Sequence, residues 1–122
     1  MDKKTWIDML TGGLDMFGNP DDEFAKYEYN TLIRFYDNYL DYSTVFLYED
    51  AFLEMFIDEY AKKFSIPEFL TQKLDELRRK IDKFYDECKE MDDFTLIKRP
   101  EWEEIKPLAK ECIEELNKLK NK

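Results

Sequence analysis

Histidine is absent from the 122-residue chain, and its absence removes most familiar routes to catalysis. Without an imidazole there is no side chain whose ordinary pKa lies near neutrality, no Ser–His or Cys–His pair, and none of the commonest metal ligand. The signatures GxxxxGK[ST], GxGxxG and GxSxG are also missing, so the sequence indicates neither a phosphate-binding loop nor a nucleophile elbow. We therefore expect no enzyme, no cofactor, no metal site and no catalytic residues.

Glycine, proline and cysteine are scarce, with three, four and two residues. So few turn formers leave little room for an all-β fold. Cys88 and Cys112 lack CxxC or metal-ligand spacing and lie on apolar helix seams, which favours buried thiols, although the sequence does not exclude a disulfide. The N-terminal residues MDKKTWIDML lack the apolar stretch of a secretion signal, and no apolar run reaches the length of about 20 residues that a membrane span needs. These features predict a soluble cytoplasmic protein.

What the chain does contain is negative charge, gathered in its first half. The net charge is −10, and residues 8–60 hold thirteen acids but only two bases, Lys26 and Arg34, whereas the rest of the chain is nearly balanced. Such an acidic chain is poorly suited to bind nucleic acid directly, because binding phosphates needs Lys and Arg. An acidic surface instead attracts basic protein partners.

Apolar residues recur at steps of three and four along most of the chain, which predicts helices. We expect a short helix over 3–10, ended by Thr11–Gly13, and four main helices over 20–41, 44–64, 66–91 and 100–119. Pro107 is expected to kink or restart the last helix, and residues 92–100 to form a connection with a brief extended piece at Phe94–Ile97. The predicted fold is a single all-α domain, residues 1–122, forming an antiparallel bundle of four main helices plus a short N-terminal helix.

The predicted helix over 44–64 carries a broad core stripe. The stripe consists of Val45, Phe46, Phe52, Leu53, Phe56, Ile57, Tyr60 and Phe64. Glu49 falls within it, and a buried unpaired carboxylate is costly, so Glu49 should accept hydrogen bonds near the helix start. A catalytic acid with a raised pKa is the other interpretation, but no second catalytic group accompanies it.

The opposite side of the same predicted helix suggests a contact surface. Leu47, Ala51 and Met55 repeat there at steps of four beside Tyr48. Along them run Asp50, Glu54 and Asp58, which would stand about 6 Å apart on a straight helix. A helix that is apolar on all sides is usually buried, so Leu47 and Met55 are either core or interface. The localised negative charge favours the interface.

Two segments combine seven of the eight tyrosines with eight acids, YEYNTLIRFYDNYLDY (27–42) and FLYEDAFLEMFIDEY (46–60). In this respect the small, acidic, histidine-free chain resembles bacterial immunity proteins, which neutralise the toxin domains of colicin-D-type bacteriocins and of contact-dependent growth inhibition systems. The resemblance implies an inhibitor that covers the basic active site of a toxin nuclease with acidic and aromatic side chains. The expected contact residues are Tyr27, Asp37 and Asp41 from the helix over 20–41, and Leu47, Tyr48, Asp50, Glu54, Met55 and Asp58 from the helix over 44–64.

Two other functions stay open at this point. A regular acidic row could imitate the backbone of DNA, in which case the protein would be a DNA mimic of phage or mobile-element origin that blocks a defence nuclease. The apolar seam over 66–91 could alternatively join copies or partners, in a helical adaptor or oligomerisation module.

Overall fold

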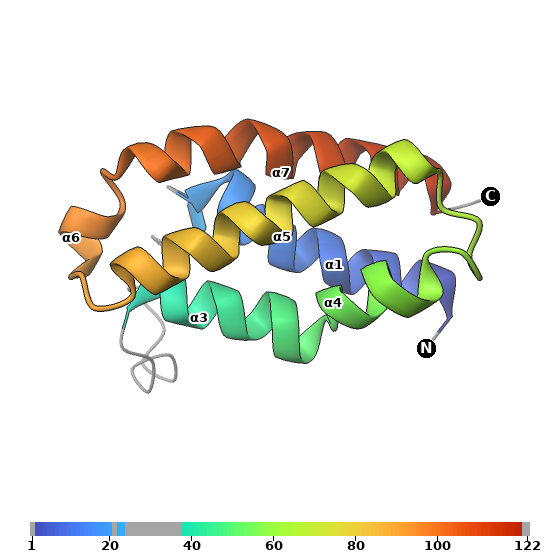
Figure 1. Ribbon diagram of the computed structural model, residues 1–122, viewed down its shortest axis with the longest axis horizontal. Coiled ribbons are helices and arrows are strands. Elements are labelled where there is room, and N and C mark those ends of the chain that lie inside the picture. Colours follow the sequence, from blue (N-terminus) through green and yellow to red (C-terminus); the bar gives the residue numbers. More distant parts are fainter. Residues whose placement is uncertain (1, 21, 24–37, 121–122) are drawn as a thin grey trace.

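The computed structural model describes residues 2–20, 22–23 and 38–120 (Figure 1). All regular structure among these residues is helical and no strand occurs in them, which confirms the predicted all-α class. The helices are α1 (Lys3–Gly18), α3 (Tyr39–Val45) with its π-helical continuation η2 (Phe46–Asp50), α4 (Leu53–Met55) with its π-helical continuation η3 (Phe56–Tyr60), α5 (Glu68–Cys88), α6 (Asp93–Leu96) and α7 (Pro100–Leu119). None of the helices in the described ranges is long and apolar enough to cross a membrane.

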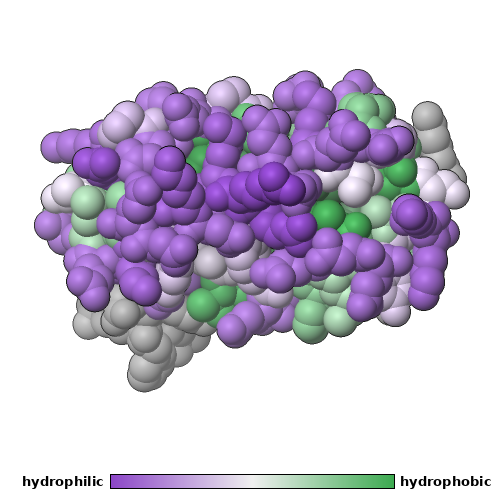
Figure 2. Space-filling model, viewed as in Figure 1, coloured by the Kyte–Doolittle hydropathy of each residue, from purple (hydrophilic) through white to green (hydrophobic). Residues whose placement is uncertain are grey.

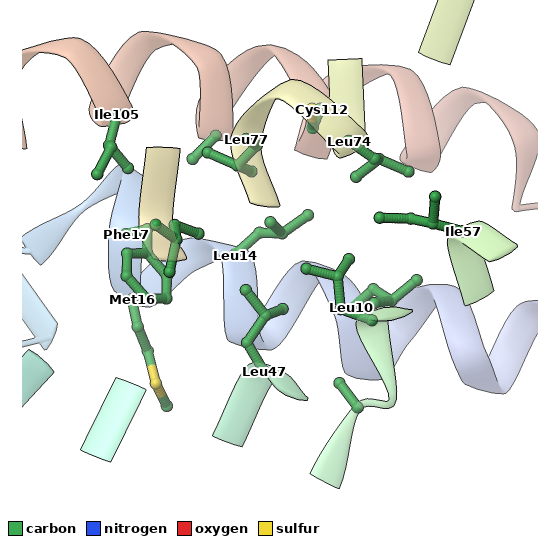
Figure 3. Packing of buried hydrophobic residues seen from close by; sticks show 14 of the residues in the cluster. Leu10, Leu14, Met16, Phe17, Leu47, Ile57, Leu74, Leu77, Ile105 and Cys112 are labelled. Carbon is green, nitrogen blue, oxygen red and sulfur yellow. The ribbon is translucent and has the colours of Figure 1, made fainter. Parts of the chain in front are cut away.

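The helices pack in a bundle-like arrangement around one core. Helix α7 lies beside both α1 and α5 (Figure 1). The consecutive segments α3, η2, α4 and η3, which we call the row, contact α1 mainly through η2 and contact α5 through α3 and η3. Side chains from all of these elements meet between them, as Figure 3 shows for Leu14, Leu47, Leu77 and Ile105.

Helix α1 is longer than predicted, because Gly12 and Gly13 do not end it. The helix begins after Asp2, whose carboxylate accepts a hydrogen bond of 2.8 Å from the Thr5 backbone N–H, and it runs through both glycines to Gly18. A Cβ on Gly13 would lie 3.0 Å from Leu47 Cδ1 and 3.3 Å from Leu47 Cα. Gly13 is therefore the place where η2 approaches the α1 backbone closely.

The sequence pattern also predicts a break near residues 41–43, between the helices over 20–41 and 44–64, and this is wrong because α3 passes through these residues. Asn38 caps its start by accepting a hydrogen bond of 2.8 Å from the Asp41 backbone N–H. The Asn38 side-chain amide also donates to the carbonyls of Lys89 and Met91, at 2.9 and 3.0 Å, which ties the start of α3 to the end of α5. The predicted continuation of the helix over 20–41 into residues 39–41 is wrong, because Asn38 is extended, with φ −161° and ψ −179°, and a new helix begins at Tyr39. Residues 24–37 of this prediction lie outside the described part.

The straight helix predicted over 44–64 is also wrong, because the chain breaks at Phe52. Phe52 has φ 53° and ψ 49°, in the left-handed region, between η2 and α4. The hydrogen bonds of η2 and η3 span one more residue than those of an α-helix, so a 100° step does not describe which residues share a face. Phe52 and Glu49, both expected in the core stripe, are exposed, whereas Leu47 and Ala51 are fully buried.

Helix α5 follows the prediction, and α7 differs from it at one point. The seam of α5, Leu70, Leu74, Leu77, Ile81, Phe84 and Cys88, is buried as expected. Helix α7 continues through Pro107, whose side chain is exposed, so the helix does not restart there. The short helix α6 replaces the extended piece expected over 94–97.

Cys88 and Cys112 are buried free thiols, as expected, and burial raises the pKa of Cys112 to about 12.

Candidate partner-binding surface

A surface groove of about 350 Å³ lies between α3–η2 on one side and α5 on the other. It is lined by Asp41, Thr44, Val45, Tyr48, Glu49, Asp82, Tyr85 and Asp86. Half of these residues carry a carboxylate and two carry a phenol, and none of the described residues that line the groove is basic. We call it the acidic groove.

Two tyrosines join the walls of the acidic groove. The Tyr48 hydroxyl from η2 donates to Asp82 Oδ1 at 2.6 Å, and it also lies 3.2 Å from the Arg78 carbonyl. The Tyr85 hydroxyl from α5 donates in the other direction, to Asp41 Oδ1 at 3.2 Å. Each wall therefore contributes one phenol to a carboxylate of the opposite wall.

The phenol of Tyr48 stays protonated at physiological pH. Burial raises the pKa of Tyr48 far above its ordinary value, and the hydrogen bond to Asp82 raises that pKa further. Tyr48 therefore remains a donor, which keeps the two walls together although both carry negative charge. The Thr44 hydroxyl is buried against the same groove and has no hydrogen-bond partner in the part of the chain that the structure describes.

The four carboxylates of the acidic groove do not form a metal site. Within the described ranges, no group of three or more cysteine, aspartate or glutamate side chains converges closely enough to hold a metal ion. The carboxylates are instead spread along a groove wide enough to admit a side chain. A lysine or arginine of a partner is the kind of group that such a groove attracts.

Beyond the groove, the row from η2 to η3 turns an acidic strip toward solvent. Its exposed members are Glu49, which also lines the groove, and Asp50, Phe52, Glu54, Met55, Asp58 and Glu59. Figure 2 shows the face crossed by α5, where hydrophilic residues cover most of the surface and hydrophobic residues gather in small patches. Within the acidic strip, Phe52 and Met55 are apolar groups surrounded in sequence by carboxylates.

Asp58 differs from the other members of the acidic strip because a base of the same chain neutralises it. Both of its carboxylate oxygens lie 3.2 Å from Arg78 Nη1, and Arg78 also pairs with Asp75. The hydrogen bond from Arg78 is the largest cause that holds the pKa of Asp75 below its ordinary value. The pair of Arg78 with Asp58 connects α5 to η3, and the Arg78 side chain is only 19% exposed. Because its charges are paired within the chain, this cluster has less charge to offer a partner than the groove has.

The structure brings some of the expected contact residues to one surface and removes others. Asp50, Glu54, Met55 and Asp58 are exposed on the acidic strip, while Asp41 and Tyr48 line the acidic groove. Leu47 was expected at the interface, which is wrong: it has no exposed surface and packs on α1 at Gly13 (Figure 3). Tyr27 and Asp37 lie outside the described residues.

Sequence reasoning missed several residues of this surface, among them three from α5 and Phe52. Asp82, Tyr85 and Asp86 come from α5, whose charges are nearly balanced overall, so a regional charge count did not single them out. Their spacing of three and four did place them on one face of α5, next to its buried seam, and this signal was available. Phe52 had no comparable signal, since its exposure follows from a backbone angle.

No protein-family model matches the chain, and neither a curated protein nor a solved structure is similar enough to count as a match. Its function is therefore argued from the acidic groove and the acidic strip.

Proposed function

We propose that this protein is an immunity protein, an inhibitor that binds and blocks the basic active-site cleft of a cognate toxin nuclease. The observation that carries the proposal is the acidic groove, where Asp41, Glu49, Asp82 and Asp86 line one cavity without a base among the described lining residues. In this proposal the helices form an antiparallel bundle that serves as a rigid scaffold, and the protein acts in the cytoplasm of a bacterium, as in contact-dependent growth inhibition.

The electrostatics of the groove support a cationic partner. Like charges that face each other across a groove repel, and a partner's Lys or Arg would replace that repulsion with attraction. A nuclease active site presents such cations, because it binds and cleaves a phosphate backbone. The tyrosines add contact area at low entropic cost beside the carboxylates.

Both alternatives lose the feature on which they rested. A DNA mimic was inferred from a regular row of Asp50, Glu54 and Asp58, but the break at Phe52 separates Asp50 from the other two and Arg78 neutralises Asp58. An adaptor was inferred from the apolar seam of α5, but that seam is buried within the chain itself.

The proposal predicts that a basic nuclease domain is encoded beside this gene, and the test is binding of that domain and protection against it. We expect the double variant Glu49→Gln/Asp86→Asn to bind that domain about tenfold more weakly or worse, chiefly through slower association, and to protect cells poorly. The association rate of the wild-type protein should fall steeply between low and physiological salt, where the Debye length is about 8 Å.

The matched control is Glu104→Gln/Glu114→Gln, which removes the same charge from exposed positions on α7. This control should bind and protect almost as well as the wild-type protein. Equal losses in both double variants would contradict a role for the groove and leave only net charge. A wild-type protein that neither binds the domain nor protects against it would refute the proposed function.

A further inference from the structure

Phe52 adopts a backbone conformation that its side chain disfavours. Its φ of 53° lies in the left-handed region, which glycine and asparagine enter readily and which a bulky residue enters at a cost. Only one other described non-glycine residue, Ser65 with φ 56°, has a positive φ. A break in the helical row would thus be easier to build with Gly or Asn at position 52.

The same backbone angle leaves the Phe52 ring exposed. Phe52 and Met55 are each 43% exposed, and they are three residues apart on either side of the start of α4. The other large apolar residues that are exposed in the described part, Phe69 and Phe94, belong to α5 and α6. The chain therefore bears two costs at one place, a disfavoured backbone angle and an aromatic ring in water.

We propose that Phe52 and Met55 form an apolar contact point that enters a pocket of the basic partner, with Asp50 and Glu54 pairing with Lys or Arg at the rim of that pocket. This inference rests on the proposed function and adds a division of roles to it. An apolar centre within a charged rim is the usual arrangement of an interface hot spot. The acidic groove would govern association, and the contact point would slow dissociation.

The charges around the contact point select this partner over other occupants. Glu49, Asp50, Glu54 and Glu59 are all exposed on the same row. A second copy of the chain would bring these carboxylates against one another, and an anionic lipid surface would repel them. A basic protein surface with an apolar pocket satisfies both the two apolar side chains and the charges.

The test separates stability from binding with the variant Phe52→Asn. Asn suits the left-handed backbone and has no apolar ring, so the melting temperature should stay equal or rise. Dissociation from the neighbouring nuclease domain should become about tenfold faster or more, while the salt dependence of association stays unchanged. Met55→Gln, a second variant, should also speed dissociation, without any change at the positive-φ position.

Two controls match the two properties of Phe52. Ser65→Gly relieves the other positive φ, and Phe94→Asn removes a ring that is 71% exposed on α6; neither should alter dissociation. The inference is overturned if Phe52→Asn binds as tightly as wild type, or if it melts well below wild type, which would make Phe52 a structural residue. If the wild-type protein does not bind the domain at all, the proposed function fails and this inference fails with it.

Discussion

The two sides of α5 treat charge in opposite ways. Toward α7, opposite charges meet: Lys73 pairs with Glu111 at 2.6 Å, and Lys80 lies 3.9 Å from Glu104. Toward α3 and η2, carboxylates face carboxylates, and tyrosine hydroxyls hold the walls together. On the first side the charges are neutralised within the chain, whereas none of the described residues that line the groove on the other side is basic.

The helices beside these two interfaces differ in regularity as well. Helices α5 and α7 run uninterrupted for 21 and 20 residues, while the row opposite them changes between α- and π-helix and breaks at Phe52. Uninterrupted amphipathic helices with a buried seam are what a stable frame requires. Irregular helix geometry, by contrast, is often found at functional sites. In the proposed function, one side of α5 therefore provides stability and the other provides recognition.

The largest effect on stability is expected from a comparison of Phe84 and Tyr85, neighbouring residues that face the two sides of α5. Phe84 is 1% exposed and packs edge-to-face on Trp102 with ring centroids 5.2 Å apart, so Phe84→Ala should lower the free energy of unfolding by about 3–5 kcal/mol. Tyr85→Phe, which removes only the hydroxyl bonded to Asp41, should lower it by less than about 1 kcal/mol. Denaturant unfolding measures both, and comparable losses would show that the groove side is as important for stability as the core.

The next effect tests how the irregular row is seated on α1. Gly13→Val would press a branched side chain against Leu47, so it should cost about 2 kcal/mol of unfolding free energy. Gly12→Val is the matched control, since a Cβ on Gly12 meets no heavy atom within 4 Å and the helix propensity changes equally. Thermal or denaturant unfolding of the pair measures the contact. Similar stabilities would show that η2 shifts freely on α1.

A smaller effect concerns the phenol that holds the groove together. Tyr48→Phe removes the donor to Asp82 and should destabilise the protein by about 1 kcal/mol, because the acceptor is charged but partly in water. Tyr60→Phe is the control: Tyr60 packs on Trp6, and its hydroxyl makes no hydrogen bond to another described residue. Asp82→Asn, made in the wild-type protein and in the Tyr48→Phe variant, completes a double-mutant cycle. An additive result would mean that Tyr48 and Asp82 do not cooperate.

The smallest effect inverts the charge on each side of α5. Asp86→Lys should stabilise the protein by about 0.3 kcal/mol at low salt, because it replaces repulsion within the groove by attraction. Glu111→Lys, the same change of two charges, should destabilise by about 0.5 kcal/mol, because it breaks the pair with Lys73. Melting curves at low salt and at high salt test this. Both changes in stability should shrink in 1 M salt. If the two variants changed the stability in the same direction, the contrast between the two sides would be contradicted.

The apolar period of the sequence correctly predicted those helices whose shape does not depend on contacts with distant segments. The seam of α5 lies where its period of three and four placed it, and both thiols are buried as their positions on the seams indicated. Proline and glycine were less reliable guides. Pro107 lies on the exposed side of an unbroken α7, and Gly13 serves close packing and not a helix end.

The candidate site was only partly predictable for a related reason. The acids of the first half are exposed around α4 as expected. The acidic groove, however, also needs Asp82 and Asp86, which follow Asp41 and Glu49 by 33 to 45 residues. Which face of the row turns outward depends on a single backbone angle at Phe52 and on π-helical hydrogen bonds. A wheel drawn at 100° per residue therefore placed Leu47 outside and Phe52 inside, the reverse of the structure.

The sequence by itself determined that the protein is helical, acidic and free of histidine chemistry, because composition and apolar period act residue by residue and need no knowledge of contacts. Only the tertiary structure decided where the negative charge goes. The close contact of η2 with Gly13 and the reversal at Phe52 rotate the row, and the rotation buries Leu47 while it sets Tyr48 against Asp82. Such choices depend on the packing of distant segments, which no local pattern encodes.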